Sequence, residues 1–109
     1  MIKAIVINVG KQANVCEIKE GYKEKLRIVE GDYLECVTLD DKFEKVMYIN
    51  ESGKLDGLPI NHVSTQIYRH YLSTDDFIAG NAVICACDSE GDTCDLTQEQ
   101  INEILGLLA

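Results

Sequence analysis

The order and type of segments in this 109-residue chain predict an α+β fold with a single-layer antiparallel or mixed sheet of about five strands. Short β-branched runs separated by turn residues indicate strands, whereas other segments carry apolar residues at helical spacing. Two or three helices, including a C-terminal helix, are expected to pack on one face of the sheet. No repeat or linker divides the chain, so residues 1–109 are expected to form one domain.

The first half of the chain predicts two hairpins with a helix between them. A β-branched run at residues 2–9 indicates a strand buried on both faces, and residues 14–18 alternate as a second strand beside it. Residues 21–30 are charged but carry apolar side chains at helical spacing, which predicts a short amphipathic helix. Residues 32–39 and 45–50 alternate on either side of an aspartate turn and predict the second hairpin.

The second half of the chain predicts two helices and one strand. Residues 62–72 have helical spacing, and residues 81–87 form a small-residue and β-branched strand that ends in an acidic turn at residues 88–95. Thr97 and Gln100 have the spacing of a capping box, in which each side chain binds a backbone N–H of the first helical turn. A C-terminal helix is therefore expected to begin there and to pack through its apolar stripe.

The net charge of −9 is concentrated after residue 70. All ten Lys and Arg residues precede that point with eleven of the acids, and eight acids without Lys or Arg follow it. Such a surface repels a nucleic-acid backbone, so direct DNA or RNA binding is not expected. Three interpretations stay open: a solubilising acidic face, a mimic of a nucleic-acid backbone, and a docking face for a basic partner. The candidate partner-binding residues are Asp88, Glu90, Asp92 and Asp95.

The expected compartment is the cytoplasm. No apolar run approaches the roughly 18 to 20 residues that span a bilayer, and the N-terminal run lacks the features of a signal peptide. The five cysteines are an odd number without a disulfide framework, so reduced thiols are expected. Neither a membrane nor an export pathway is expected to be involved.

A polar cluster around the turn-rich stretch at residues 50–61 is the candidate small-ligand site. Its members combine amide donors and acceptors with cations that suit phosphate or carboxylate: Asn50, Lys54, Asn61, His62 and Arg69. If the loop folds over the start of the second predicted helix, these groups converge. The alternative is that the asparagine side chains hold the backbone of the loop itself.

The cysteines offer the best candidate for a metal site. Cys85 and Cys87 are expected on one face of a strand, with Cys94 in the next turn and His62 or His70 as a fourth ligand. The paired C-x2-C knuckles typical of zinc are absent, and the acidic turn lacks the helix and the bidentate glutamate of an EF-hand. No metal or cofactor is therefore expected.

The sequence offers few groups for catalysis. His62 and His70 lie eight positions apart without a nearby Ser or Cys arrangement that defines a nucleophile. Asp75 and Asp76 lie in a predicted loop, and Gly53 and Lys54 are not followed by the Ser or Thr of a P-loop. We expect a protein that is not an enzyme.

Five short segments together carry a resemblance to a known family. They are residues 29–35 (VEGDYLE), 50–54 (NESGK), 58–61 (LPIN), 76–80 (DFIAG) and 96–97 (LT). In their order and spacing they resemble the family of the domain of unknown function 3846, whose members are small proteins of phages, plasmids and integrative elements. The chain departs from that family where Glu30 replaces a glycine and His62 replaces an arginine, and the second change weakens any anion site built on that position.

The resemblance implies an accessory protein of a mobile element, present in the cytoplasm of a bacterial host. We expect a non-enzymatic acidic binding protein that blocks a host protein, with counter-defence as the expected role. The alternatives are a protein that sequesters a small nucleotide-like ligand, in a loop pocket between subunits of a homo-oligomer, and a small uncharacterised enzyme.

Overall fold

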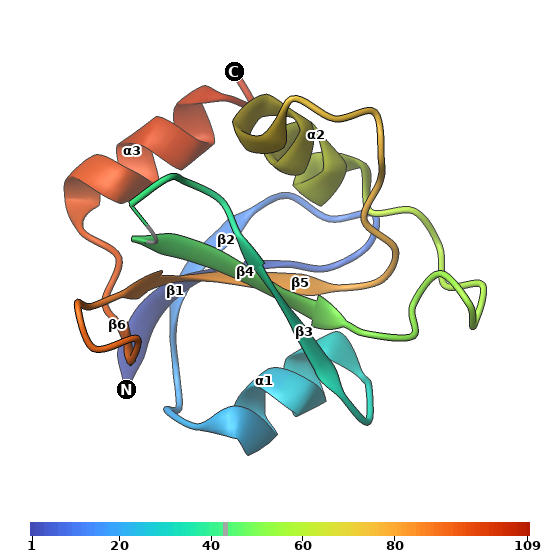
Figure 1. Ribbon diagram of the computed structural model, residues 1–109, viewed down its shortest axis with the longest axis horizontal. Helices are drawn as coiled ribbons and strands as arrows, with labels where there is room; N and C mark the ends of the chain where they lie inside the picture. The colour runs from blue at the N-terminus through green and yellow to red at the C-terminus, as the bar shows by residue number, and fades with distance from the viewer. Residues whose placement is uncertain (43) are drawn as a thin grey trace.

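The fold is one antiparallel sheet with helices on both of its faces (Figure 1). The computed structural model describes residues 1–42 and 44–109. Along the chain the elements are β1 (Ile2–Ile7), β2 (Asn14–Ile18), α1 (Tyr22–Val29), β3 (Leu34–Thr38), β4 (Lys45–Asn50), α2 (His62–Leu72), β5 (Ala82–Cys87), β6 (Thr93–Cys94) and α3 (Gln98–Gly106). None of the helices in the described part of the chain is long and apolar enough to cross a membrane.

The strand order β2-β1-β5-β4-β3 places the last long strand at the centre of the sheet. Both predicted hairpins are confirmed, because β1 pairs with β2 and β3 pairs with β4, each antiparallel. One strand was missed. Residues 93 and 94, which the sequence placed in a turn, form β6 and pair with the end of β5. β2 and β3 are the two edge strands of this order.

Two apolar clusters, one on each face, hold the helices to the sheet. Ile5 and Ile7 of β1 point toward α2 and α3, whereas Ile2 and Ala4 point toward α1. The expectation that all helices share one face is therefore wrong for α1. Since the side chains of a strand alternate between faces, a strand that is apolar at consecutive positions needs a cover on both sides.

Asn61 joins three elements at one end of the sheet. Its side-chain Nδ2 donates to the carbonyl oxygens of Ile7 at 2.9 Å and Gly80 at 3.0 Å. Its Oδ1 accepts from the backbone N–H of Ser64 at 3.0 Å and so caps α2. The side chain is only 1% exposed, so these bonds form away from water. One amide group thus ties the end of β1, the chain entering β5 and the start of α2.

Gly53 shows why the loop before α2 needs a glycine. A Cβ atom at this position would lie 2.8 Å from the carbonyl oxygen of Ala79, which is backbone and cannot swing away. The close approach lets the loop run beside the segment that leads into β5, where Ile60 and Ala79 form a β-bridge.

A buried cation ties the opposite end of the sheet to α3. Lys45 Nζ lies 2.9 Å from Asp40 Oδ2 and 3.1 Å from Glu103 Oε2, and the lysine side chain is only 8% exposed. The hydroxyl of Tyr71 on α2 donates to Glu103. Because β4, the turn before it, α2 and α3 each supply one group, the cluster fixes both helices over the same sheet face.

The cluster shifts the pKa values of its carboxyl groups. Burial raises the pKa of Asp40, but hydrogen bonds from Lys45 and from two backbone N–H groups outweigh it and leave that pKa below its usual range. The hydrogen bond from Tyr71, together with Lys45, holds the pKa of Glu103 below its usual range. Both groups are therefore ionised in the folded protein at neutral pH, and their pairing contributes to stability.

Replacing Asn61 with alanine is expected to lower the free energy of unfolding by about 2 to 4 kcal/mol, because the helix cap and the donors to two buried carbonyl groups are lost together. Asn61→Ser keeps an acceptor for the cap and is expected to lose less. Urea unfolding measures both. The control is Asn14→Ala at an exposed position, expected to stay within about 0.5 kcal/mol of the wild type. Equal losses in Asn61→Ala and Asn14→Ala would contradict the role assigned to Asn61.

Acid is expected to destabilise the fold through the Lys45 cluster. Because folding lowers both carboxyl pKa values, the stabilisation is present above the ordinary carboxyl range and is lost as pH falls through the lowered values. The urea concentration at the midpoint of unfolding should decrease as the pH is lowered from about 6 to about 3. This decrease should be smaller in Asp40→Asn/Glu103→Gln. The matched control is Asp41→Asn/Glu99→Gln, both exposed. A fall of equal size in the two double variants would show that the cluster does not set the acid response.

Candidate functional site

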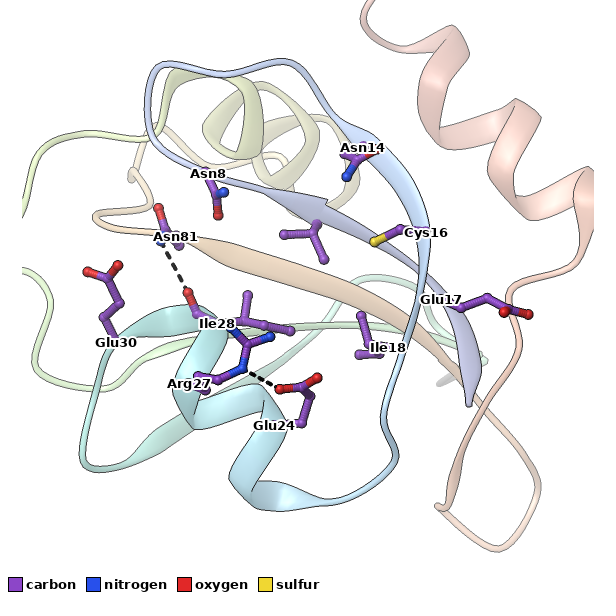
Figure 2. Close-up of a pocket in the computed structure, with 11 residues that line it drawn as sticks. Asn8, Asn14, Cys16, Glu17, Ile18, Glu24, Arg27, Ile28, Glu30 and Asn81 are labelled. Carbon is purple, nitrogen blue, oxygen red and sulfur yellow. Dashed lines mark hydrogen bonds and ion pairs between the residues drawn. The ribbon is translucent and has the colours of Figure 1, made fainter.

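A polar groove of about 310 Å³ lies between α1 and the β1–β2 hairpin (Figure 2). It forms because α1 packs mainly over β3, β4 and β5 and leaves the part of the same face around Val6, Asn14 and Cys16 open. The lining residues are mostly polar: Val6, Asn8, Asn14, Cys16, Glu17, Ile18, Glu24, Arg27, Ile28, Glu30 and Asn81. The volume lies at the lower bound of the roughly 300 to 1,000 Å³ found for small-molecule sites.

Asn81 fixes one wall of the groove. Its Oδ1 accepts from the backbone N–H of Val9 at 2.9 Å, and its Nδ2 donates to the carbonyl oxygen of Ile28 at 3.1 Å. The side chain thus joins the loop after β1 to the end of α1. Sequence reasoning missed this role, since Asn81 was read only as the first residue of a predicted strand.

The charges of the groove favour a neutral or cationic ligand over a phosphate. Arg27 Nε donates to Glu24 Oε1 at 2.5 Å, and this bond lowers the pKa of Glu24 and raises that of Arg27. Glu30 adds a second carboxylate, while Glu17 points away from the other lining side chains (Figure 2). Since the one guanidinium is already paired, the groove offers little net attraction to an anion.

The thiol of Cys16 is not an activated nucleophile. Burial raises its pKa, so the thiol is protonated at neutral pH, whereas catalytic cysteines have a lowered pKa. The groove lining contains no histidine to act as a partner base. What the groove offers chemically is hydrogen bonding by amide groups, with Asn8 and Asn14 both exposed.

The structure uses Asn50 and Asn61, two of the predicted ligand residues, to hold backbone. Asn61 makes the three buried bonds described above. Asn50 accepts from the backbone N–H of Ser52 at 3.0 Å and donates to the carbonyl oxygen of Glu30 at 3.4 Å. It is 6% exposed. The alternative in which asparagine side chains hold the loop's own backbone describes Asn50, which bonds Ser52, whereas Asn61 bonds backbone outside the loop.

The two predicted cations are held by the loop that precedes β5. Lys54 Nζ lies 2.6 Å from Asp76 Oδ1 and sits over the ring of Phe77. Arg69 donates to the carbonyl oxygens of Asp76 and Asp75, each at 2.8 Å. Lys54 and Arg69 therefore both bind the same short segment, and both stay exposed.

The predicted set does not close into one cavity. Asn50 and Lys54 line a pocket of about 70 Å³, far below the roughly 300 Å³ at the lower bound of small-molecule sites. His62 is exposed at the first position of α2 and does not line that pocket. Ligand binding by these residues stays a prediction, and the groove beside α1 gives more room.

All four predicted partner-binding acids are exposed in or just after the β5–β6 turn. Two of them also shape the backbone. Asp88 Oδ1 accepts from the N–H groups of Glu90 at 2.9 Å and Asp92 at 3.0 Å. Asp95 Oδ1 accepts from the N–H of Lys3 at 2.7 Å. Glu90 and Asp92 are the pair that can be altered without removing such a bond.

The β3–β4 turn brings further acids to the same place. The backbone N–H of Cys87 donates to the carbonyl oxygen of Glu44 at 2.9 Å, so residues 40–42 and 44 lie beside the turn at residues 88–92. A hollow of about 350 Å³ between them is lined by Lys42, Glu44, Asp88 and Asp95 among others. We call the six exposed carboxylates here the acidic end: Asp41, Glu44, Asp88, Glu90, Asp92 and Asp95.

The cysteines do not gather around a metal position. Cys85 and Cys87 point toward α1, whereas Cys94 packs on the opposite face of the sheet, because it pairs with Ala86 and shares its side of the pleat. Within residues 1–42 and 44–109, no group of three His, Cys, Asp or Glu side chains is placed to hold a metal ion.

Comparisons with known proteins identify the family but add no activity. No curated protein and no solved structure matches the chain. One family model matches over residues 2–109, with the description "domain of unknown function (DUF3846)". The match covers nearly the whole sequence, and with it the sheet, the three helices and both candidate surfaces. The chain therefore belongs to the DUF3846 family.

Proposed function

We propose that this protein is a non-enzymatic binding protein of a phage or other mobile element that occupies a basic surface of a host protein. Counter-defence in the bacterial cytoplasm is the role that best suits such a small blocking protein. The single observation that carries the proposal is the acidic end, where two turns far apart in the sequence present six exposed carboxylates, and Glu44, Asp88 and Asp95 among them line one hollow.

The placement of the acids supports binding rather than solubility alone. Charges that serve only solubility are spread over a surface with both signs mixed. Here the ammonium of Lys42 is the one cation lining the hollow between the turns. Because charges gathered on one patch steer an oppositely charged partner, such an end favours fast association with a basic surface.

A second candidate function is the sequestration of a small polar ligand in the groove beside α1. The volume of about 310 Å³ and the exposed amides of Asn8 and Asn14 favour it. The carboxylates of the groove favour a nucleoside or an amine over a nucleotide. A thermal shift with nucleosides that is absent in an Asn8→Ala/Asn14→Ala variant would support this candidate.

Reversing charge at the acidic end is expected to abolish partner binding. In Asp41→Lys/Glu90→Lys/Asp92→Lys, three exposed side chains change sign, and none of the three carboxylates accepts a hydrogen bond within the described residues. Host proteins that bind the wild type at low salt should not bind this variant. They should also not bind the wild type at about 0.5 M salt, since both changes remove the attraction between charged surfaces.

The matched control makes the same change in charge elsewhere. Glu17→Lys/Glu20→Lys/Asp56→Lys alters three exposed acids outside the acidic end and is expected to retain the same proteins. Quantitative mass spectrometry measures how much of each host protein the two variants retain. The proposal fails if both variants lose the same proteins, or if neither does.

A further inference from the structure

The two edges of the sheet differ in what surrounds them. Within the part of the chain that the structure describes, β2 and β3 each pair with one neighbouring strand, so one side of each carries backbone groups without a strand partner. Such an edge can accept an extended segment of another protein as an additional strand. The charged and aromatic side chains beside each strand decide which edge suits such a segment.

The free backbone groups of β3 belong to Cys36 and Thr38. The N–H of Leu39 donates to the carbonyl oxygen of Lys45, and the N–H of Glu51 donates to the carbonyl oxygen of Tyr33. The backbone groups of the odd-numbered residues of β3 therefore face β4. Since antiparallel ladders alternate, the N–H and C=O groups of even-numbered residues point outward. The N–H of Leu34 donates to the hydroxyl of Tyr22, so among the described residues the outward N–H groups without a partner are those of Cys36 and Thr38.

Hollows with carboxylates lie on both faces of β3. On the α1 side, Cys36 and Thr38 line a hollow of about 440 Å³ together with Asp88 and Lys42. On the α2 side, the exposed Glu35 lines the small pocket that also holds Glu51 and the ion pair of Lys54 with Asp76. Because an added strand alternates its side chains, consecutive residues would meet acids on one face and then the other.

Two exposed tyrosines stand at the start of β3. Tyr22 is 54% exposed and Tyr33 is 65% exposed, which is unusual for side chains of this size. The hydroxyl of Tyr22 bonds the first residue of the strand, so its ring lies alongside the edge. Aromatic faces attract lysine and arginine, and tyrosine is among the residues that anchor interfaces.

The β2 edge lacks this chemistry. By the same alternation its outward groups belong to Val15 and Glu17, since the N–H and C=O of Lys3 are taken by Asp95 and Leu96 on the other side of β1. Its exposed charges are mixed, with Lys3 directly across from Glu17 and Lys19 following the strand. Such an edge shows no preference for a basic or an acidic segment.

We propose that β3 accepts an extended, lysine- or arginine-rich segment of the partner protein as an additional strand. This inference rests on the proposed function and specifies how the partner binds. Backbone bonds to Cys36 and Thr38 hold the segment, while its basic side chains reach Glu35 on one face and Asp88 on the other. The same acids oppose pairing of two copies through β3, because like charges would then face each other.

The test uses a fluorescent peptide with the repeat Lys-Lys-Val-Val, which places lysines on both faces of an extended strand, and measures its binding by anisotropy at low salt. Cys36→Pro removes one outward N–H and leaves the ladder to β4 in place, because proline is tolerated at the outward positions of an edge strand. Binding is expected to weaken about tenfold or more. Amide shifts in NMR spectra of the wild type are expected to concentrate at residues 34–38.

Two control variants separate the edge from the side chain. Cys36→Ala removes the thiol but keeps the N–H, and Val15→Pro removes an outward N–H from the other edge. Both are expected to bind the peptide within about twofold of the wild type, because the backbone groups of β3 are intact. Equal weakening by Val15→Pro and Cys36→Pro would overturn the assignment to β3.

A modified peptide tests the inference on the unaltered protein. Methylation of backbone nitrogens at consecutive positions keeps every charge but blocks both edges of the extended peptide, so binding is expected to weaken about tenfold. If the methylated peptide binds as tightly as its parent, strand addition is overturned. The proposed function would still stand if Asp41→Lys/Glu90→Lys/Asp92→Lys weakened both peptides.

Discussion

The amide group of Asn61 is the constraint on which the arrangement of this fold depends most directly. It binds carbonyl groups of the segments that end β1 and enter β5, and it caps α2 with its remaining oxygen. Those two strands are neighbours at the centre of the sheet, and α2 covers one face of them. A side chain that is buried and fully bonded leaves little freedom to its surroundings, because any shift leaves a polar group without a partner.

The second constraint is that the central strands are apolar on both faces. β5 is buried at its first five positions, so each face of the sheet needs a cover. α2 and α3 provide one, and α1 provides the other. A single short helix cannot cover five strands, and α1 sits over β3, β4 and β5. The open part of that face is the polar groove, and its floor includes the partly exposed Cys16 because no helix reaches it.

Much of the fold was predictable because local signals and long-range packing agree. The capping box of Thr97 and Gln100 begins α3 as expected, and the bounds predicted for α2 at residues 62–72 match the structure. The side of the sheet taken by α1 was not predictable, since periodicity identifies an apolar face but not the surface it meets. The groove wall made by Asn81 was missed for the same reason: its partners, Val9 and Ile28, are 72 and 53 residues away.

The distribution of charge along the sequence differs from its distribution on the folded protein. Along the chain, the acids after residue 70 form one block, and Asp41 and Glu44 belong to a nearly neutral part. In the folded protein the bond between Cys87 and Glu44 joins the two turns, so Glu44 and Asp88 line one hollow and Asp88 also lies beside Cys36 and Thr38 of β3. An edge strand needs charges that prevent unwanted pairing, and a binding strand needs charges that select its partner. The same carboxylates serve both needs here, because they repel a second copy of this acidic protein and attract a basic segment.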